Sequence, residues 1–153
     1  MNIFGLPLHP LVVHAAVVLI PLASLGALIV VMSARARERF GWLTVAFAVA
    51  AAGAAITARL SGEAFAESLG GIATLIATNR QWGELTPWPA VALAITLPAG
   101  LLIRSRSKPA WVAAAVLTVL AAVAALILVV LTGEAGARAV WGRSGPCSTG
   151  FAG

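Results

Sequence analysis

Two histidines and two glutamates are the residues of this chain best suited to bind a metal or a cofactor. His9 and His14 stand at the start of the first long apolar segment, and Glu63 and Glu134 each follow a glycine just after a later one. Imidazole and carboxylate are both ligands of borderline cations such as zinc. The four residues therefore suggest a divalent-metal site. The alternative cofactor is haem b, with one histidine as its axial ligand.

The spacing of the histidines argues against a chelate made by one helix. His9 and His14 are five residues apart, which places them about 140° apart around a regular helix. They could share a ligand only if His9 lies off the helix. The structural alternative is that His9 caps the helix and His14 donates to a neighbouring helix, because polar groups within lipid must find partners. Intramembrane ionisable groups are nevertheless often functional, so His14 is the leading single candidate.

Two charged pairs compete with this ligand role. Arg59 with Glu63, and Glu134 with Arg138, are each spaced i,i+4, so each pair can share a helical face and form an interfacial ion pair. Aspartate is absent, and there is no Gly-rich phosphate loop, cysteine pair or Ser-His-Asp set. A soluble-type catalytic mechanism has no complete set of groups here. The sequence therefore predicts a protein that is not an enzyme.

The elements that must position these residues are apolar segments. Hydrophobic residues make up 61% of the 153 residues and charged residues only 10%. A bilayer core needs about 20 helical residues, and four segments satisfy this: residues 10–32, 40–58, 87–103 and 110–131. The predicted fold is all-α, an integral membrane four-helix bundle that forms a single transmembrane domain over residues 1–153. No basic region precedes the first segment, which is expected to stay as a membrane helix. The remaining parts are an outer loop, residues 59–86, and an outer tail, residues 132–153.

Positive charges indicate the orientation of the bundle. Six of the ten Lys and Arg residues fill the two short links between paired segments: Arg35, Arg37, Arg39, Arg104, Arg106 and Lys108. The positive-inside rule places these links in the cytoplasm and both termini outside a bacterial cytoplasmic membrane. The net charge of +5 is then a topology signal, and nucleic-acid binding is not expected. The expected partners are the lipid bilayer and a homo-oligomer or larger membrane complex.

The two halves of the chain resemble each other. Pro10 and Pro21 are eleven residues apart, as are Pro87 and Pro98, and the second proline of each pair is predicted to kink its helix. A motif that begins Leu-Ser-Gly-Glu at Leu60 returns as Leu-Thr-Gly-Glu 71 residues later. The prolines are offset by 77, so six residues are expected to be missing from the second turn. We interpret the two helical hairpins as a weak parallel repeat; chance similarity in an Ala- and Leu-rich chain is the alternative.

Small residues predict how the helices pack. A small-xxx-small spacing in the second and fourth segments suggests interior faces, because small side chains let membrane helices approach closely: these residues are Ala46, Ala50, Ala54, Ala121 and Ala125. The alternative is that such faces form a dimer interface. The tryptophans fall near the predicted membrane boundaries and suggest an aromatic belt: Trp42 and Trp111 inside, and Trp82, Trp88 and Trp141 outside.

Several motifs carry a family resemblance. The opening Leu6-Pro7-Leu8-His9-Pro10-Leu11-Val12-Val13-His14 and the closing Gly136-Ala137-Arg138-Ala139-Val140-Trp141-Gly142 are similar to those of the bacterial membrane family catalogued as domain of unknown function 2231, and look like its actinobacterial branch. The resemblance implies a four-helix membrane topology and no assigned activity. Members often carry a histidine four residues before the glycine that matches Gly83, where this chain has Asn79. A cofactor model that needs this third histidine does not fit the chain.

Three functional hypotheses follow. The first is a small non-enzymatic membrane protein, an accessory or interaction subunit of a membrane assembly. The second is a haem b or metal-binding protein that uses His9 and His14 at the outer face. The third is an oligomeric transporter or channel, in which Pro21 and Pro98 supply a broken backbone at the midplane.

Overall fold

The computed structural model describes residues 2–3, 6–68 and 81–141 of the chain. It contains four long helices, α1 (Leu8–Met32), α2 (Ala34–Ser68), α4 (Pro87–Ile103) and α5 (Lys108–Trp141). Residues 81–85 add a short helical segment before α4. At the amino-terminal side, β1 (Asn2–Ile3) pairs antiparallel with β2 (Leu6–Pro7). This pairing of two-residue strands, which the apolar pattern does not predict, leads directly into α1.

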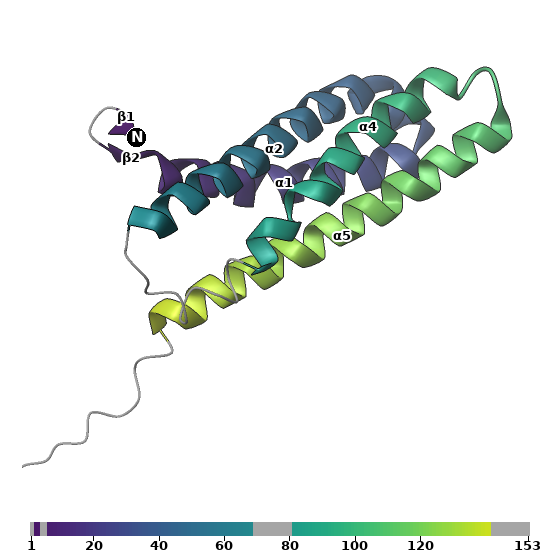
Figure 1. Cartoon of the computed structure of the whole chain (residues 1–153). Coiled ribbons are helices and arrows are strands. Elements are labelled where there is room, and N and C mark those ends of the chain that lie inside the picture. Colours follow the sequence, from purple (N-terminus) through teal and green to yellow (C-terminus); the bar gives the residue numbers. More distant parts are fainter. Residues whose placement is uncertain (1, 4–5, 69–80, 142–153) are drawn as a thin grey trace, which may run out of the picture.

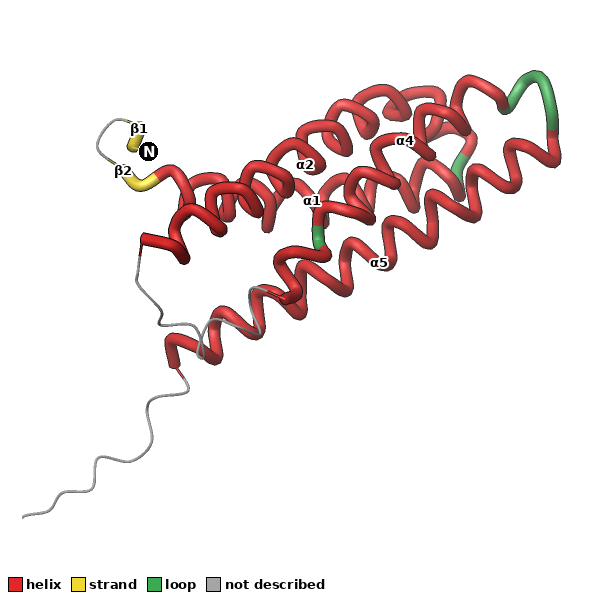
Figure 2. The backbone as a smooth tube through the Cα atoms, viewed as in Figure 1, coloured by secondary structure: helices red, strands yellow, loops and turns green. Residues whose placement is uncertain are grey.

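The long helices form an up-down-up-down bundle (Figure 1). α1 packs against α2 and α5, and α4 packs against the same two helices from the opposite corner. The links from α1 to α2 and from α4 to α5 are short and lie at the same end of the bundle (Figure 2). All four helical segments are long and apolar enough to cross a membrane. The prediction of an all-α membrane four-helix bundle is confirmed.

A serine directly precedes the second helix of each hairpin and caps it. The Ser33 hydroxyl accepts the Ala36 amide at 3.3 Å, and the Ser107 hydroxyl accepts the Ala110 amide at 3.4 Å. An N-cap oxygen of this kind satisfies an amide that has no acceptor within the helix. Ser33 is the only non-helical residue between α1 and α2, and residues 104–107 connect α4 to α5. The caps therefore allow both chain reversals to be short.

The prolines lie where the sequence places them, with one shift. Pro87 begins α4, whereas α1 begins at Leu8, so Pro10 is the third residue of its helix. Both positions suit proline because the first amides of a helix have no acceptor. Pro21 and Pro98 lie inside their helices, and each frees the carbonyl four residues earlier from its helical donor. The kinks expected at these two prolines stay predictions.

Two helices are longer than their apolar segments. α2 has 35 residues and α5 has 34, although about 20 suffice to cross a bilayer core. Residues 59–68, predicted as outer loop, and residues 132–141, predicted as outer tail, are helical. Both helices therefore continue past the ends of the predicted membrane spans. Hydropathy marks the lipid span but not the end of a helix: both extensions contain Ala, Glu and Arg, which are good helix formers, and no proline interrupts them.

The bundle has a small-residue interior and a large-residue exterior. Its core consists mostly of alanine, with Ile20, Val30, Leu93, Leu97 and Val129 among the larger members. The outward faces carry exposed aliphatic side chains along the helices. A soluble bundle would bury such side chains, whereas lipid solvates them without cost. The apolar exterior therefore faces the bilayer.

The predicted small-residue faces are half right. Ala121 and Ala125 of α5 are buried, as expected. Ala46 and Ala50 of α2 are exposed, so the prediction that they face the interior is wrong. The buried face of α2 carries instead Ala48, Ala51, Ala52 and Ala55. A shift of two residues turns a side chain by about 200°, and α2 has alanine on nearly every side, so its composition does not set the phase.

Glycines allow close approach between neighbouring helices. A Cβ added at Gly26 of α1 would lie 3.0 Å from the Cγ2 atom of Thr44 in α2. One added at Gly41 of α2 would lie 3.2 Å from a Cδ1 atom of Leu101 in α4. Both distances are shorter than ordinary van der Waals contact. The absence of a side chain at these glycines therefore sets how closely the helices pack.

Burial in the two hairpins follows the predicted repeat. Ile20 and Leu97, 77 residues apart, are each 1% exposed. Thr44 and Thr118, 74 apart, are both buried, and each hydroxyl donates to the carbonyl four residues earlier, at 2.9 and 2.8 Å. The expected loss of six residues in the turn is therefore split. Three are lost by the start of the second helix, and the other three before the motif that repeats at an offset of 71.

Candidate functional site

The two histidines predicted as ligands both lie in α1. Because α1 begins at Leu8, His9 is in its first turn and not at the cap position before it. Two residues five apart on one helix point about 140° apart, so His9 and His14 cannot be placed side by side by this helix. The side chain of His14 is exposed on the outside of the bundle. α1 therefore does not by itself assemble a site from the two histidines.

The other predicted polar residues lie toward the same end. Glu134 is exposed on α5, and Arg59 is half-buried on α2. Each of these two residues, like His14, takes part in at least one polar, ring or electrostatic interaction. The side chains of His9, Glu63 and Arg138 lie outside the described residues, as do Asn79 and Cys147. The ion pairs Arg59–Glu63 and Glu134–Arg138 stay predictions.

A metal site is not assembled within the described part of the chain. There, no three His, Cys, Asp or Glu side chains come together in a group that could hold a metal ion. The buried polar side chains of that part are hydroxyls: Ser24, Thr44, Thr86 and Thr118. Hydroxyls alone offer neither an axial haem ligand nor a zinc ligand set.

Two hydroxyls inside the bundle have no hydrogen-bond partner. These are the Oγ atom of Ser24, in a side chain that is 0% exposed, and the Oγ1 atom of Thr96. Each lies within one turn of an intrahelical proline, Pro21 in α1 or Pro98 in α4. By contrast, the hydroxyl of Thr86, the residue before α4, forms a hydrogen bond of 3.3 Å with the hydroxyl of Thr132 in α5. An unpartnered buried hydroxyl costs stability.

The opposite end of the bundle holds an ordered arginine. The Nε atom of Arg37 donates to the Val30 carbonyl at 3.1 Å, and its Nη2 atom donates to the Val31 carbonyl at 3.3 Å. These are carbonyls of the last turn of α1, where helical donors run out. A cation at a helix C-terminus also interacts favourably with the helix dipole. Arg37 therefore ties the start of α2 to the end of α1.

A tryptophan of the other hairpin completes this arrangement. The Arg37 guanidinium lies 4.4 Å from the ring centroid of Trp111, the range of a cation–π contact. Trp111 lies in the first turn of α5, and its ring packs against α4 at Gly100, where an added Cβ would lie 3.1 Å from Cζ3. Gly100 therefore leaves room for the ring. Arg37 and Trp111 link the two hairpins at the end with the short links.

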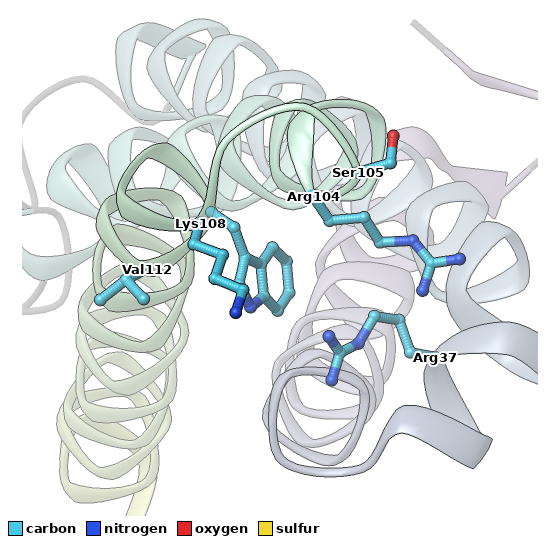
Figure 3. Close-up of a pocket in the computed structure, with 6 residues that line it drawn as sticks. Arg37, Arg104, Ser105, Lys108 and Val112 are labelled. Carbon is cyan, nitrogen blue, oxygen red and sulfur yellow. The ribbon is translucent and has the colours of Figure 1, made fainter.

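A cavity of about 520 Å³ opens beside this contact. We call it the basic pocket; its lining residues are Arg37, Arg104, Ser105, Lys108, Trp111 and Val112. Figure 3 shows the side chains of Arg37 and Arg104 on facing sides of the opening, with Lys108 on α5. Three of the six residues are cationic and none is acidic. Such a pocket suits an anion.

Sequence reasoning missed the basic pocket. It treats the charges of both links as a topology signal and Trp111 as part of an aromatic belt. The pocket depends on two hairpins meeting side by side: Arg37 comes from the start of α2, and the other lining residues come from the second short link and the start of α5, about 70 residues later in the chain. The sequence does contain a signal, because the positive-inside rule predicts both links on the same side of the membrane. The sequence does not indicate which of the cations contacts the other hairpin.

The fold and its four candidate spans define an integral membrane helical bundle. Residues 5–145 match the family model described as "Predicted membrane protein (DUF2231)", and the chain belongs to this family. No curated protein and no solved structure matches the chain. The family is therefore confirmed, whereas the branch within it stays a prediction.

Proposed function

We propose that this chain is a non-enzymatic membrane protein that acts by association, as a homo-oligomer or as a subunit of a larger membrane complex. The association surface is the outward face of α2, made by Ala46, Ala50, Gly53 and Thr57, which we call the α2 outer face. All four residues are exposed. At about 100° per residue they lie within about 60° of one another and opposite the buried alanines of the same helix.

Gly53 is the observation that carries the proposal. A Cβ added there would meet nothing within 4 Å, so packing within the bundle gives no reason for a glycine. Glycine inside a helix costs about 1 kcal/mol relative to alanine. Gly26, Gly41 and Gly100 each offset this cost by a close approach to a neighbouring helix. A second chain that packs against α2 would give Gly53 the same role.

The chemistry of α2 supports association in lipid. Membrane helices gain little from the hydrophobic effect when they associate and depend on close packing between small residues. Val49 and Ile56 are exposed beside the α2 outer face and would flank a helix lying on it. The Thr57 hydroxyl donates to the Gly53 carbonyl at 2.8 Å, so this polar group can be covered without loss of its partner. Burial of the α2 outer face against another helix therefore leaves the Thr57 hydroxyl with its hydrogen-bond partner.

The non-enzymatic part of the proposal is supported by the described polar groups. Those inside the bundle are hydroxyls, and His14 and Glu134 are exposed. No general acid or base stands beside a nucleophile in this interior, which an enzymatic site requires. The proposal includes the orientation given by the charges: the basic links in the cytoplasm and both termini outside a bacterial cytoplasmic membrane.

A comparison of two glycine variants tests the proposal. The wild-type chain and the variants Gly53→Leu and Gly133→Leu are purified in mild detergent, and their mass and co-purifying chains are determined. Gly133 is the matched control, because it is also exposed and an added Cβ there also meets nothing within 4 Å, but it lies on α5 beyond the apolar segment 110–131 and next to Glu134, away from the α2 outer face. We expect Gly53→Leu to dissociate the assembly and Gly133→Leu to leave it intact. A monodisperse wild-type monomer without a partner would contradict the proposal.

A further inference from the structure

The basic pocket continues into an apolar groove. This groove has a volume of about 280 Å³ and lies between the end of α1 and one face of α5; its lining residues are Val31, Trp111, Val112, Ala115, Val116, Val119 and Leu120. Trp111 and Val112 line both cavities. We propose that the two cavities together bind one anionic phospholipid, with its phosphate in the basic pocket and an acyl chain in the groove. The site does not involve the α2 outer face.

The charges of the basic pocket match a phosphate. Arg37 and Arg104 offer planar guanidinium groups, which bind phosphate oxygens through paired N–H donors. Lys108 adds a point charge, and the exposed Ser105 adds a hydroxyl. No lining residue is acidic. An anionic headgroup therefore meets three cations and no repelling carboxylate in the pocket lining.

The key cation is held in place before a ligand binds. Arg37 uses two of its five N–H donors on the Val30 and Val31 carbonyls. Its guanidinium also stacks on Trp111. A side chain fixed in this way loses little conformational entropy when an anion arrives. Arg37 lines the basic pocket with donors left over for an anion.

The apolar groove has the length and direction of an acyl chain. From Trp111 to Leu120 it follows α5 over nine residue steps, about 14 Å of helix at 1.5 Å per step. One leaflet is about half of a hydrocarbon core of about 30 Å. The groove begins at the charged end of the helix and runs toward the centre of the membrane. A free phosphate ion would fill the pocket but would leave the groove unused.

The contrast between pocket and non-pocket cations separates a lipid site from a general preference for anionic membranes. The short links and the starts of α2 and α5 hold six cations, of which Arg37, Arg104 and Lys108 line the basic pocket. Arg35 and Arg106 are exposed and do not line it. General attraction to a leaflet would weaken equally when any two of these charges are removed. At a specific site, the loss of lipid binding would depend on which two charges are removed.

The test uses the full-length protein in detergent with added phosphatidylglycerol or phosphatidylcholine, and native mass spectrometry measures bound lipid. Arg104→Gln/Lys108→Gln is compared with the matched control Arg35→Gln/Arg106→Gln. We expect the wild type and the control to retain phosphatidylglycerol in preference to phosphatidylcholine. Loss of two basic residues at the pocket is expected to weaken retention by about 30-fold.

A second pair of variants tests the groove. Ala115→Trp is expected to fill it and to expel the acyl chain with all pocket charges intact, whereas Leu117→Trp, exposed on α5 and outside the groove, is expected to leave binding unchanged. Equal effects of the two double variants, or equal retention of both lipids by the wild type, would overturn the proposal. Displacement of the lipid by millimolar inorganic phosphate, with no effect of Ala115→Trp, would assign the pocket to a free anion and would also overturn it.

Discussion

Substitution of Gly26 by alanine should weaken the packing of α1 against α2 and lower the stability of the bundle. The new Cβ would lie 3.0 Å from the Cγ2 atom and 3.4 Å from the Oγ1 atom of Thr44. Thr44 cannot rotate away cheaply, because its hydroxyl donates to the Phe40 carbonyl at 2.9 Å and the residue is buried. Overpacking of this kind costs about 1–3 kcal/mol, and the better helix propensity of alanine offsets about 1 kcal/mol. We expect a net destabilisation of about 1 kcal/mol.

A rescue variant makes this prediction specific. Thr44→Ser removes the crowded Cγ2 methyl group and keeps the hydroxyl, so Gly26→Ala/Thr44→Ser should recover most of the lost stability. Gly53→Ala is the control, since nothing lies within 4 Å of its added Cβ; it should be neutral or stabilising in the dissociated chain. Reversible unfolding in mixed micelles measures the free energy of unfolding of Gly26→Ala, Thr44→Ser, the double variant and Gly53→Ala. Equal stabilities of Gly26→Ala and Gly53→Ala, or no coupling between positions 26 and 44, would refute the close-approach argument.

Three further predictions concern the interior, the outer end and the orientation. Ser24→Ala should stabilise the bundle by about 1 kcal/mol in the same unfolding assay, because it removes a buried hydroxyl without a partner; destabilisation would show that the hydroxyl is bonded. His14→Ala should cost about 0.6 kcal/mol and at most about 2 kcal/mol, the range of polar links between membrane helices, and a loss of haem or metal from the purified protein on this change would restore the ligand hypothesis. In a background without the native cysteine, Ser105→Cys should be protected from an impermeant thiol reagent in intact cells and Gln81→Cys should react; the reverse pattern would invert the orientation.

The sequence predicts the fold well because lipid imposes a simple requirement. Each spanning helix needs about 20 apolar residues, and the four segments found in this way all lie within helices of the structure. The same requirement says nothing of where a helix ends in water. This is why hydropathy predicts a loop and a tail where the structure has the polar extensions of α2 and α5, residues 59–68 and 132–141.

Neither the face of α2 that is buried nor the basic pocket could be predicted from the sequence, and the two reasons differ. α2 carries alanine on opposite faces, so Ala46 and Ala48 are equally suited to the interior by size, and only the neighbouring helices decide between them. The pocket requires Arg37 to meet Trp111, a contact between two hairpins that no local pattern encodes. By contrast, the proline spacing does indicate the repeat, because the two hairpins bury residues at matching positions, such as Ile20 and Leu97.

Cysteine cross-linking within the membrane tests the central proposal, association through the α2 outer face, most directly. In a Cys147→Ser background, Ala50→Cys places a thiol on the α2 outer face, and Leu117→Cys places one on the exposed surface of α5. Oxidation of isolated membranes should cross-link Ala50→Cys to a second copy, and Leu117→Cys should stay uncross-linked. Cross-linking at Leu117→Cys but not at Ala50→Cys would contradict the account.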